Sequence, residues 1–208
     1  MGAGSAVRLR HVLLHRLFDL RSGGIPGYQP HQLHMAEPNL YNLGQRYLGA
    51  NNMLYTFGYE GLDINRYIAR LHDVGVKTIV DVRQLPLSRK RGFSKRVFAE
   101  ALVQSGIAYL HAPTLGCPKA IRDALKADGD WHAYTTAFLS YLGTQDAAVR
   151  ELAKLSRATT VCLVCFEADF NQCHRTFVAR AAHGRGAPAI AHITAQTVTT
   201  DSPLRVAA

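Results

Sequence analysis

The sequence of 208 residues contains few acidic side chains, few cysteines and no long apolar run. Only 15 Asp and Glu stand against 24 Lys and Arg, and the formal net charge of +9 favours an anionic partner. Four cysteines are too few to staple a chain of this length, which excludes a disulfide scaffold. Without a secretory signal they predict reduced thiols and a cytoplasmic protein. No apolar run approaches the length of a membrane span, so we expect no membrane partner.

The first 52 residues differ in composition from the rest. They are rich in Gly, Pro, Asn, Gln and His, and no apolar pattern in them completes a core. We therefore predict that residues 1–52 are disordered or result from a wrong start of translation, since Met53 directly precedes the first organised segment. One domain is expected over residues 53–195, followed by a flexible tail over residues 196–208.

From residue 53 onward, short apolar strands alternate with helical segments. A strand at 54–57 is followed by a helix that Asp63 caps and by a nearly continuous apolar strand at 77–82. Strand, helix and strand with short links form a βαβ unit, whose strands are parallel. Further strands are expected at 108–111, 159–164 and 188–193, and Ser94 is expected to cap the helix before the first of these. This order predicts a Rossmann-like α/β fold with an open, mainly parallel sheet and helices on both faces.

The stretch from Val161 to Arg175, VCLVCFEADFNQCHR, passes from a buried strand through a polar loop into the start of a helix. A cation at a helix N-terminus is unfavourable unless an anion compensates it, and a thiol there has a lowered pKa. We therefore predict an anion-binding site with a reactive thiol. Glu167 or His174 is expected to move protons, and Cys165 or Cys173 is the candidate nucleophile.

A second basic site follows the strand at 77–82. Six cations and no acid occur between residues 83 and 96, and they are Arg83, Arg89, Lys90, Arg91, Lys95 and Arg96. Uncompensated cations on one loop favour a phosphate or a nucleic-acid backbone nearby. Because parallel strands end at one edge of a sheet, we predict a substrate site made by side chains around these strand ends. The candidates are Tyr59, Glu60, Asp81, Arg83, Ser88, Arg89, His111 and Arg175.

The cysteines also allow a metal site. Cys162 and Cys165 are three residues apart, so on one strand they face opposite sides of the sheet. The adjacent Cys173 and His174 rarely serve the same ion, and the spacing is not that of the usual zinc motifs. We therefore expect no metal and no cofactor.

The segment from Ile79 to Arg83 is similar to an early strand of the rhodanese-type sulfurtransferases. Their catalytic loop requires a cysteine and an arginine cradle at close spacing. Arg175 lies ten residues after Cys165 and two after Cys173, and neither spacing fits. Sulfur transfer is therefore not favoured.

Four motifs occur in order along the chain: TFGYEG at 56–61, VDVRQLPLSRKRGFSK at 80–95, YLHAPTLG at 109–116 and CFEADFNQCHR at 165–175. Over about residues 53–195 the chain resembles the bacterial and archaeal family known as domain of unknown function 488. The family's pattern of a cysteine, a Glu and Cys-His-Arg falls on Cys165, Glu167 and residues 173–175. The resemblance implies a Rossmann-like domain with one shared site, and it names no reaction.

The function favoured by these patterns is an enzyme that acts on a phosphate-bearing substrate, either a nucleotide or a nucleic acid. Two alternatives stay open. The basic loop also fits a non-catalytic module that binds nucleotides or nucleic acid. The cysteine cluster also fits a metal-binding protein.

Overall fold

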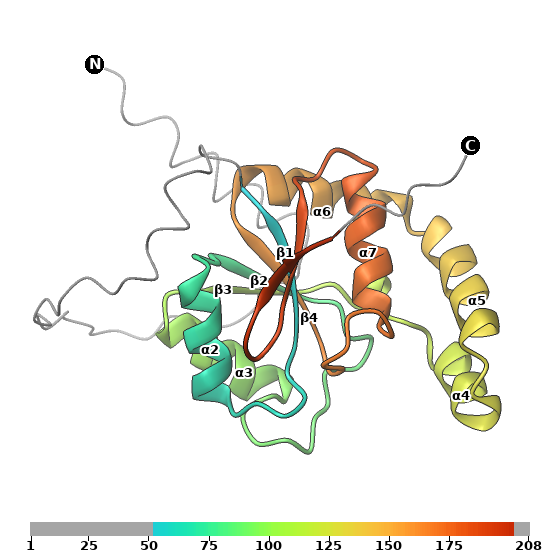
Figure 1. The fold of residues 1–208 in the computed structure, drawn as a ribbon, viewed down its shortest axis with the longest axis horizontal. Coiled ribbons are helices and arrows are strands. Elements are labelled where there is room, and N and C mark those ends of the chain that lie inside the picture. Colours follow the sequence, from blue (N-terminus) through green and yellow to red (C-terminus); the bar gives the residue numbers. More distant parts are fainter. Residues whose placement is uncertain (1–51, 202–208) are drawn as a thin grey trace, which may run out of the picture. The chain divides into compact units, whose positions relative to one another are not determined.

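A computed structural model describes residues 52–201, and the predictions for residues 1–51 and 202–208 lie outside this range. Its centre is one six-stranded sheet with the strand order β3-β2-β4-β1-β5-β6 (Figure 1). The strands are β1 (Leu54–Gly58), β2 (Thr78–Asp81), β3 (Ala108–His111), β4 (Val161–Cys165), β5 (Ile190–Ile193) and β6 (Val198–Thr200). The first five are parallel, and β6 pairs with β5 in the antiparallel sense. The predicted α/β fold with a mainly parallel sheet is confirmed.

The carboxyl ends of the central strands lie along one edge of the sheet. Gly58 at the end of β1 is level with Cys165 at the end of β4, and Asp81 at the end of β2 is level with His111 at the end of β3. The pairing of β2 with β4 places Asp81 beside Val164. The sequence motifs that follow these strands therefore meet at the same edge.

Helices cover both faces of the sheet (Figure 1). Two of them, α2 (Ile64–Asp73) and α3 (Lys95–Gln104), pack on one face. The remaining helical segments are η3 (Pro113–Leu115), α4 (Lys119–Asp128), α5 (Trp131–Gly143), α6 (Asp146–Ala158) and α7 (His174–His183). Among the described helices, none combines the length and the apolarity needed to cross a bilayer.

An aromatic core lies between the sheet and the helices α2 and α3. Phe57 stacks on Tyr67 with ring centroids 4.3 Å apart. Cys162 belongs to the same core, together with Val164. Successive strand residues point to opposite faces, so Cys165 at the end of β4 faces the other side, toward α7.

The strand β4 marks a change in the side on which the next helix packs. β1 and β2 lead into α2 and α3 on one face, whereas β4 leads into α7 on the opposite face. Such a switch point leaves space beyond the strand ends, and this is where open α/β sheets bind ligands.

Two details differ from the sequence-based expectations. Ser94 precedes α3, but its side chain makes no capping hydrogen bond, because its Oγ donates instead to the carbonyl of Ser88 at 2.8 Å. Within the tail expected to be flexible, residues 198–200 form β6. This strand is exposed and lacks an apolar alternation, so its pattern gave no signal. Its ladder with β5 and the ion pair between Asp201 and Arg180 hold it in place.

Candidate functional site

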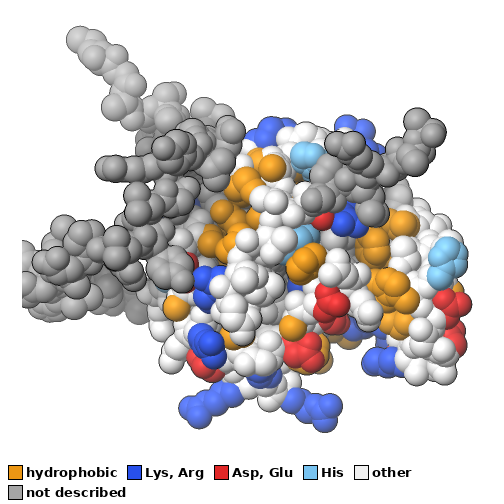
Figure 2. Space-filling view, viewed as in Figure 1, with side chains coloured by type: hydrophobic (Ala, Val, Ile, Leu, Met, Phe, Trp, Pro, Cys, Tyr) orange, Lys and Arg blue, Asp and Glu red, His pale blue; other side chains and the backbone are white. Residues whose placement is uncertain are grey.

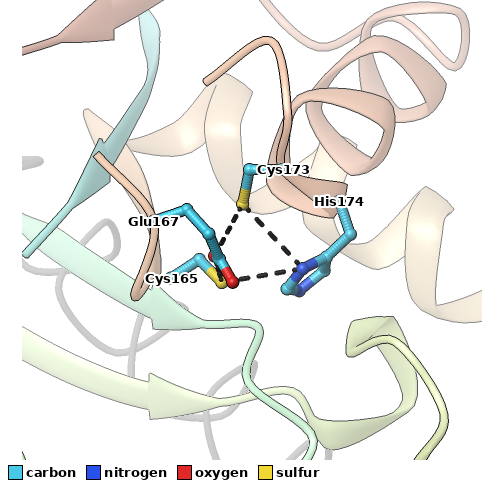
Figure 3. A group of neighbouring side chains, drawn as sticks. All are labelled: Cys165, Glu167, Cys173 and His174. Atoms are coloured by element: carbon cyan, nitrogen blue, oxygen red, sulfur yellow. Dashed lines mark hydrogen bonds between the residues drawn. The ribbon is translucent and has the colours of Figure 1, made fainter. Parts of the chain in front are cut away.

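Four side chains meet beyond the end of β4 (Figure 3). Cys165 is the last residue of β4, and Glu167 follows it in the loop. Cys173 is the N-cap of α7, and His174 is the first residue of that helix. One ligand atom from each side chain lies within 4.8 Å of the other three. The structure therefore brings all four predicted catalytic residues together, and we call this group the Cys-Glu-His cluster.

Hydrogen bonds connect the members of the cluster. Glu167 Oε2 accepts from Cys165 Sγ at 2.7 Å and lies 3.1 Å from Cys173 Sγ. His174 Nδ1 lies 3.6 Å from the first sulfur and 3.9 Å from the second. On the other side of the ring, Nε2 lies 3.0 Å from the carbonyl of Val82 and donates to it. This contact fixes the ring so that Nδ1 faces the two sulfurs.

Most of the cluster is shielded from solvent. Cys165 is 4% exposed, Cys173 is 2% exposed and His174 is 6% exposed. Glu167 is the partly exposed member. A reagent that approaches from solvent therefore reaches the carboxylate more readily than the sulfurs.

Burial and charge shift the pKa values of the cluster residues in different directions. Burial disfavours the Cys173 thiolate, but hydrogen bonds from Cys165 and His174 and the positive charge of His174 outweigh it, and the pKa of Cys173 falls well below its ordinary value. Burial and the neighbouring Cys173 raise the pKa of Cys165 well above its ordinary value. Burial also raises the pKa of Glu167. These contacts and charges favour the thiolate form at Cys173 over that at Cys165.

The other two cysteines are separate from the cluster. Cys162 lies in the aromatic core on the opposite face of the sheet, and burial raises its pKa. Cys117 is buried, and burial raises its pKa as well. All four cysteines are free thiols.

The adjacent Cys173 and His174, which were expected not to serve the same ion, turn toward one point. Cys173 has an extended backbone, with φ −144° and ψ 137°, and His174 opens the helix. The change of backbone conformation between these neighbours turns both side chains toward one point. A strand or a helix alone would have separated them.

Arg83 and Asp81, both predicted to bind substrate, form a buried ion pair. Arg83 Nε donates to Asp81 Oδ1 at 2.8 Å, and Arg83 Nη1 donates to the hydroxyl of Tyr59 at 2.9 Å. The Asp81 carboxylate also accepts from Tyr109 at 2.7 Å, and His111 Nε2 lies 3.0 Å from the carbonyl of Arg83. The charge of Arg83 is thus neutralised within the fold, and the network fixes the start of the connection from β2 to α3.

Arg175 and Glu60 shape the loop that carries Glu167. Arg175 is fully buried, and its guanidinium donates to the carbonyls of Glu167 at 2.6 Å and Ala168 at 3.2 Å. Glu60 accepts from the amide of Ala168 at 3.0 Å. These contacts hold the loop from both sides, and they occupy groups that the sequence predicted would bind substrate.

The connection from β2 to α3 carries the exposed cations. Arg89, Arg91, Lys95 and Arg96 are exposed, and Ser88 holds the connection through its hydroxyl and its carbonyl. Lysine and arginine side chains project from the lower edge of the molecule in Figure 2, where Figure 1 draws this connection in green. Burial lowers the pKa of His111, which lies at the end of β3.

Two glycines that the sequence analysis did not single out are essential to this geometry. A Cβ at Gly58 would lie 1.7 Å from the carbonyl oxygen of Glu167. A Cβ at Gly116 would lie 2.3 Å from the amide nitrogen of Gln84 and 2.8 Å from the oxygen of Val82 that His174 contacts. Gly58 lies in the motif TFGYEG and Gly116 in the motif YLHAPTLG. A glycine at such a position can indicate a close backbone approach.

Comparison with protein-family models gives a match over residues 63–182 to the family described as "Domain of unknown function DUF488". The chain belongs to this family. The match confirms the resemblance seen in the sequence motifs, and it includes the whole Cys-Glu-His cluster. Searches of curated proteins and of solved structures each found no match. The DUF488 family carries no named reaction, so a function for this chain rests on the site itself.

Proposed function

We propose that the protein is an enzyme that acts on a phosphate-bearing substrate, either a nucleotide or a nucleic acid. The observation that carries this proposal is the contact between His174 and Val82 at 3.0 Å. Val82 directly precedes the connection that carries the exposed cations, so this contact joins the Cys-Glu-His cluster to the basic segment. The cluster and a segment with several exposed cations thus share one edge of the sheet.

The exposed cations supply the affinity for phosphate. Among the described residues, Arg89, Arg91 and Lys95 form no ion pair with a carboxylate, and arginine forks match the geometry of a phosphate. Arg83 and Arg175 are less suitable, because both are buried and already hydrogen-bonded. The residues that bind the anion are therefore the exposed members of the basic segment.

Glu167 is the group that moves protons in this proposal. It is the most exposed member of the cluster, and burial raises the pKa of its carboxyl group. The cytoplasmic location predicted from the sequence stays part of the proposal, since four free thiols suit a reducing compartment.

Calorimetric titration with phosphate, mononucleotides and short single-stranded DNA tests the binding part. Arg89→Ala, Arg91→Ala and Lys95→Ala should each lose about 1.5 kcal/mol, or roughly tenfold in affinity, if the charge contacts a phosphate. Lys126→Ala on α4 is the matched control, because Lys126 is exposed and lies outside the basic segment. Equal losses in all four variants would indicate net charge rather than a site.

Turnover is tested with the same panel by following the release of phosphate and of nucleosides. Glu167→Gln should retain binding within about threefold and lose at least about a hundredfold in rate, the usual scale of a proton-transfer residue. Tight binding of a nucleotide or DNA with no turnover of any substrate would indicate a non-catalytic binding module instead of an enzyme. If none of these anions binds at low salt, the proposal is refuted.

A further inference from the structure

We propose that Cys165, Cys173 and His174 bind a zinc ion, and that Glu167 stands beside the fourth position of that ion as a general base. The proposed role of the metal rests on the enzymatic function above, but the binding of the metal does not. The ion would lie within the Cys-Glu-His cluster, and its bound water would be the nucleophile that the exposed side chains do not offer.

The distances between the donor atoms fit a shared zinc ion. In tetrahedral coordination with Zn–S near 2.3 Å and Zn–N near 2.0–2.1 Å, a sulfur and a nitrogen ligand are about 3.6 Å apart. His174 Nδ1 lies 3.6 Å from Cys165 Sγ and 3.9 Å from Cys173 Sγ. The imidazole nitrogen is thus almost equally distant from both sulfurs, as expected for a shared ion. In a catalytic pair, one cysteine would be close to the imidazole and the other remote.

The two cysteines of the cluster are buried. A nucleophilic cysteine must meet its substrate and is partially exposed in most enzymes, whereas a ligand to a metal can be buried. Cys165 and Cys173 are 4% and 2% exposed. Their place beneath the partly exposed Glu167 suits metal ligands better than nucleophiles.

The contacts around the cluster also suit a metal site. A histidine that binds a metal almost always donates its other ring N–H to a carbonyl or a carboxylate, and His174 donates to Val82 at 3.0 Å. Two thiolates neutralise a divalent ion, which leaves the Glu167 carboxylate to balance the buried guanidinium of Arg175. The hydrogen-bond partners of Arg175 among the described residues are neutral backbone carbonyls, so an anion in the cluster accounts for its burial.

The order of the residues has a chemical parallel. In zinc deaminases a Cys2His set binds the ion, and a glutamate two residues after the first ligand moves the proton of the bound water without binding the metal. Here Glu167 follows Cys165 by two residues, and Cys173 and His174 supply the other ligands. With three protein ligands the zinc keeps an open position, which is the arrangement of catalytic rather than structural sites.

The corresponding reaction is hydrolysis of a phosphate ester. The bound water gives one proton to Glu167, and the remaining hydroxide forms a bond to phosphorus. The bond from phosphorus to the leaving oxygen then breaks with its electron pair, and that oxygen takes the proton from Glu167. Water is the co-reactant, and neither an oxidant nor a reductant is needed.

The test uses the full chain without a histidine tag, purified under reducing conditions without a chelator and then supplied with Zn²⁺. We expect one zinc per chain by elemental analysis. With Co²⁺ we expect the intense visible bands of tetrahedral coordination and a thiolate-to-cobalt charge-transfer band. Wild-type protein that takes up neither ion in stoichiometric amount would overturn the inference.

Variants identify the ligands by competition with a chromophoric chelator. Cys165→Ser, Cys173→Ser and His174→Ala should weaken zinc binding by more than the roughly 10–100-fold that loss of a supporting hydrogen bond costs. Cys162→Ala and Cys117→Ala are matched controls, since both residues are buried free cysteines outside the cluster, and they should stay within about threefold of wild type. Equal losses in the controls would overturn the assignment.

Two further measurements keep the test decisive. Zinc should raise the Tm of the wild-type protein and leave that of Cys165→Ser unchanged, which separates loss of a ligand from loss of the fold. Glu167→Gln should keep zinc affinity within about tenfold, and a loss as large as that of the cysteine variants would overturn its role as a base. Zinc binding without any phosphate binding would support the zinc site and refute the proposed function. Anion binding without zinc binding would refute the zinc site and leave the proposed function standing.

Discussion

The close packing of Gly58 against the Glu167 loop allows one stability prediction to be worked out in detail. The change is Gly58→Ala, which adds a single methyl group at the end of β1. That methyl carbon would lie 1.7 Å from the oxygen and 2.6 Å from the carbon of the Glu167 carbonyl group. Both atoms belong to the backbone, so no rotation of a side chain can relieve the overlap.

Relief requires the loop or the end of β1 to move by more than about 1 Å, since ordinary contacts of a Cβ begin near 3.4 Å. The backbone hydrogen bonds between these segments oppose such a movement. They join Tyr59 to Cys165 at 3.2 Å and Glu60 to Phe166 at 2.9 Å. Overpacking of this kind costs about 1–3 kcal/mol, and we expect the upper part of that range, about 2–3 kcal/mol. For a chain of this size the loss corresponds to a fall of roughly 4–12 °C in Tm.

Urea unfolding and calorimetry measure the effect, with Gly143→Ala as the control. Gly143 is the last residue of α5, and a Cβ there meets nothing within 4 Å. The control should be neutral or should stabilise the protein by up to about 1 kcal/mol, because alanine favours a helix. A Gly58→Ala variant within about 0.5 kcal/mol of wild type would refute the packing of the Glu167 loop against β1.

Three further predictions concern the rest of the domain. Asp81→Asn should lower the free energy of unfolding in urea by about 3 kcal/mol, because it leaves the buried Arg83 without its carboxylate partner. The control Asp73→Asn removes an exposed carboxylate and should lower it by less than about 1 kcal/mol. Burial lowers the pKa of His192 below its ordinary 6.5, so the neutral imidazole contributes to the free energy of unfolding above that pH, and this contribution is lost as the pH falls through the lowered pKa. His192→Gln should flatten the pH dependence of the free energy of unfolding. An unchanged pH profile in this variant would contradict the prediction. A chain of residues 53–208 should melt as cooperatively as the full chain, since the buried hydrophobic residues of the described part run from Leu54 to Ile193; a loss of several degrees would count against this boundary.

Most strands of the sheet can be predicted from the sequence, because the patterns that indicate them lie within short segments of the chain. Apolar runs and the cap at Asp63 predict β1, α2 and β2, and short links predict that these strands are parallel. The order of the strands does not follow, since nothing local in β4 states that it lies between β1 and β2. The strand β6 escaped prediction because backbone pairing and Asp201 hold it rather than an apolar face.

The candidate site was predictable in its membership but not in its internal roles. The motif around residues 165–175 indicates that its polar residues gather at a strand end. Which of the cations would face solvent depends on contacts that are distant in the chain. Arg83 finds Asp81 and Tyr59, and Arg175 finds two loop carbonyls, so their charges are used within the fold. The shared orientation of Cys173 and His174 depends on one backbone change that residue spacing does not reveal.

The central position of β4 has a consequence for the order in which the chain folds. β1 and β2 are close in sequence but do not pair with each other, since both pair with β4, which is synthesised about a hundred residues after β1. A ribosome must therefore release most of the domain before its sheet can close, and until then both early strands keep open edges. Such late, long-range pairing makes folding slow and leaves nascent chains open to aggregation, so production of this protein should depend strongly on temperature and on chaperones.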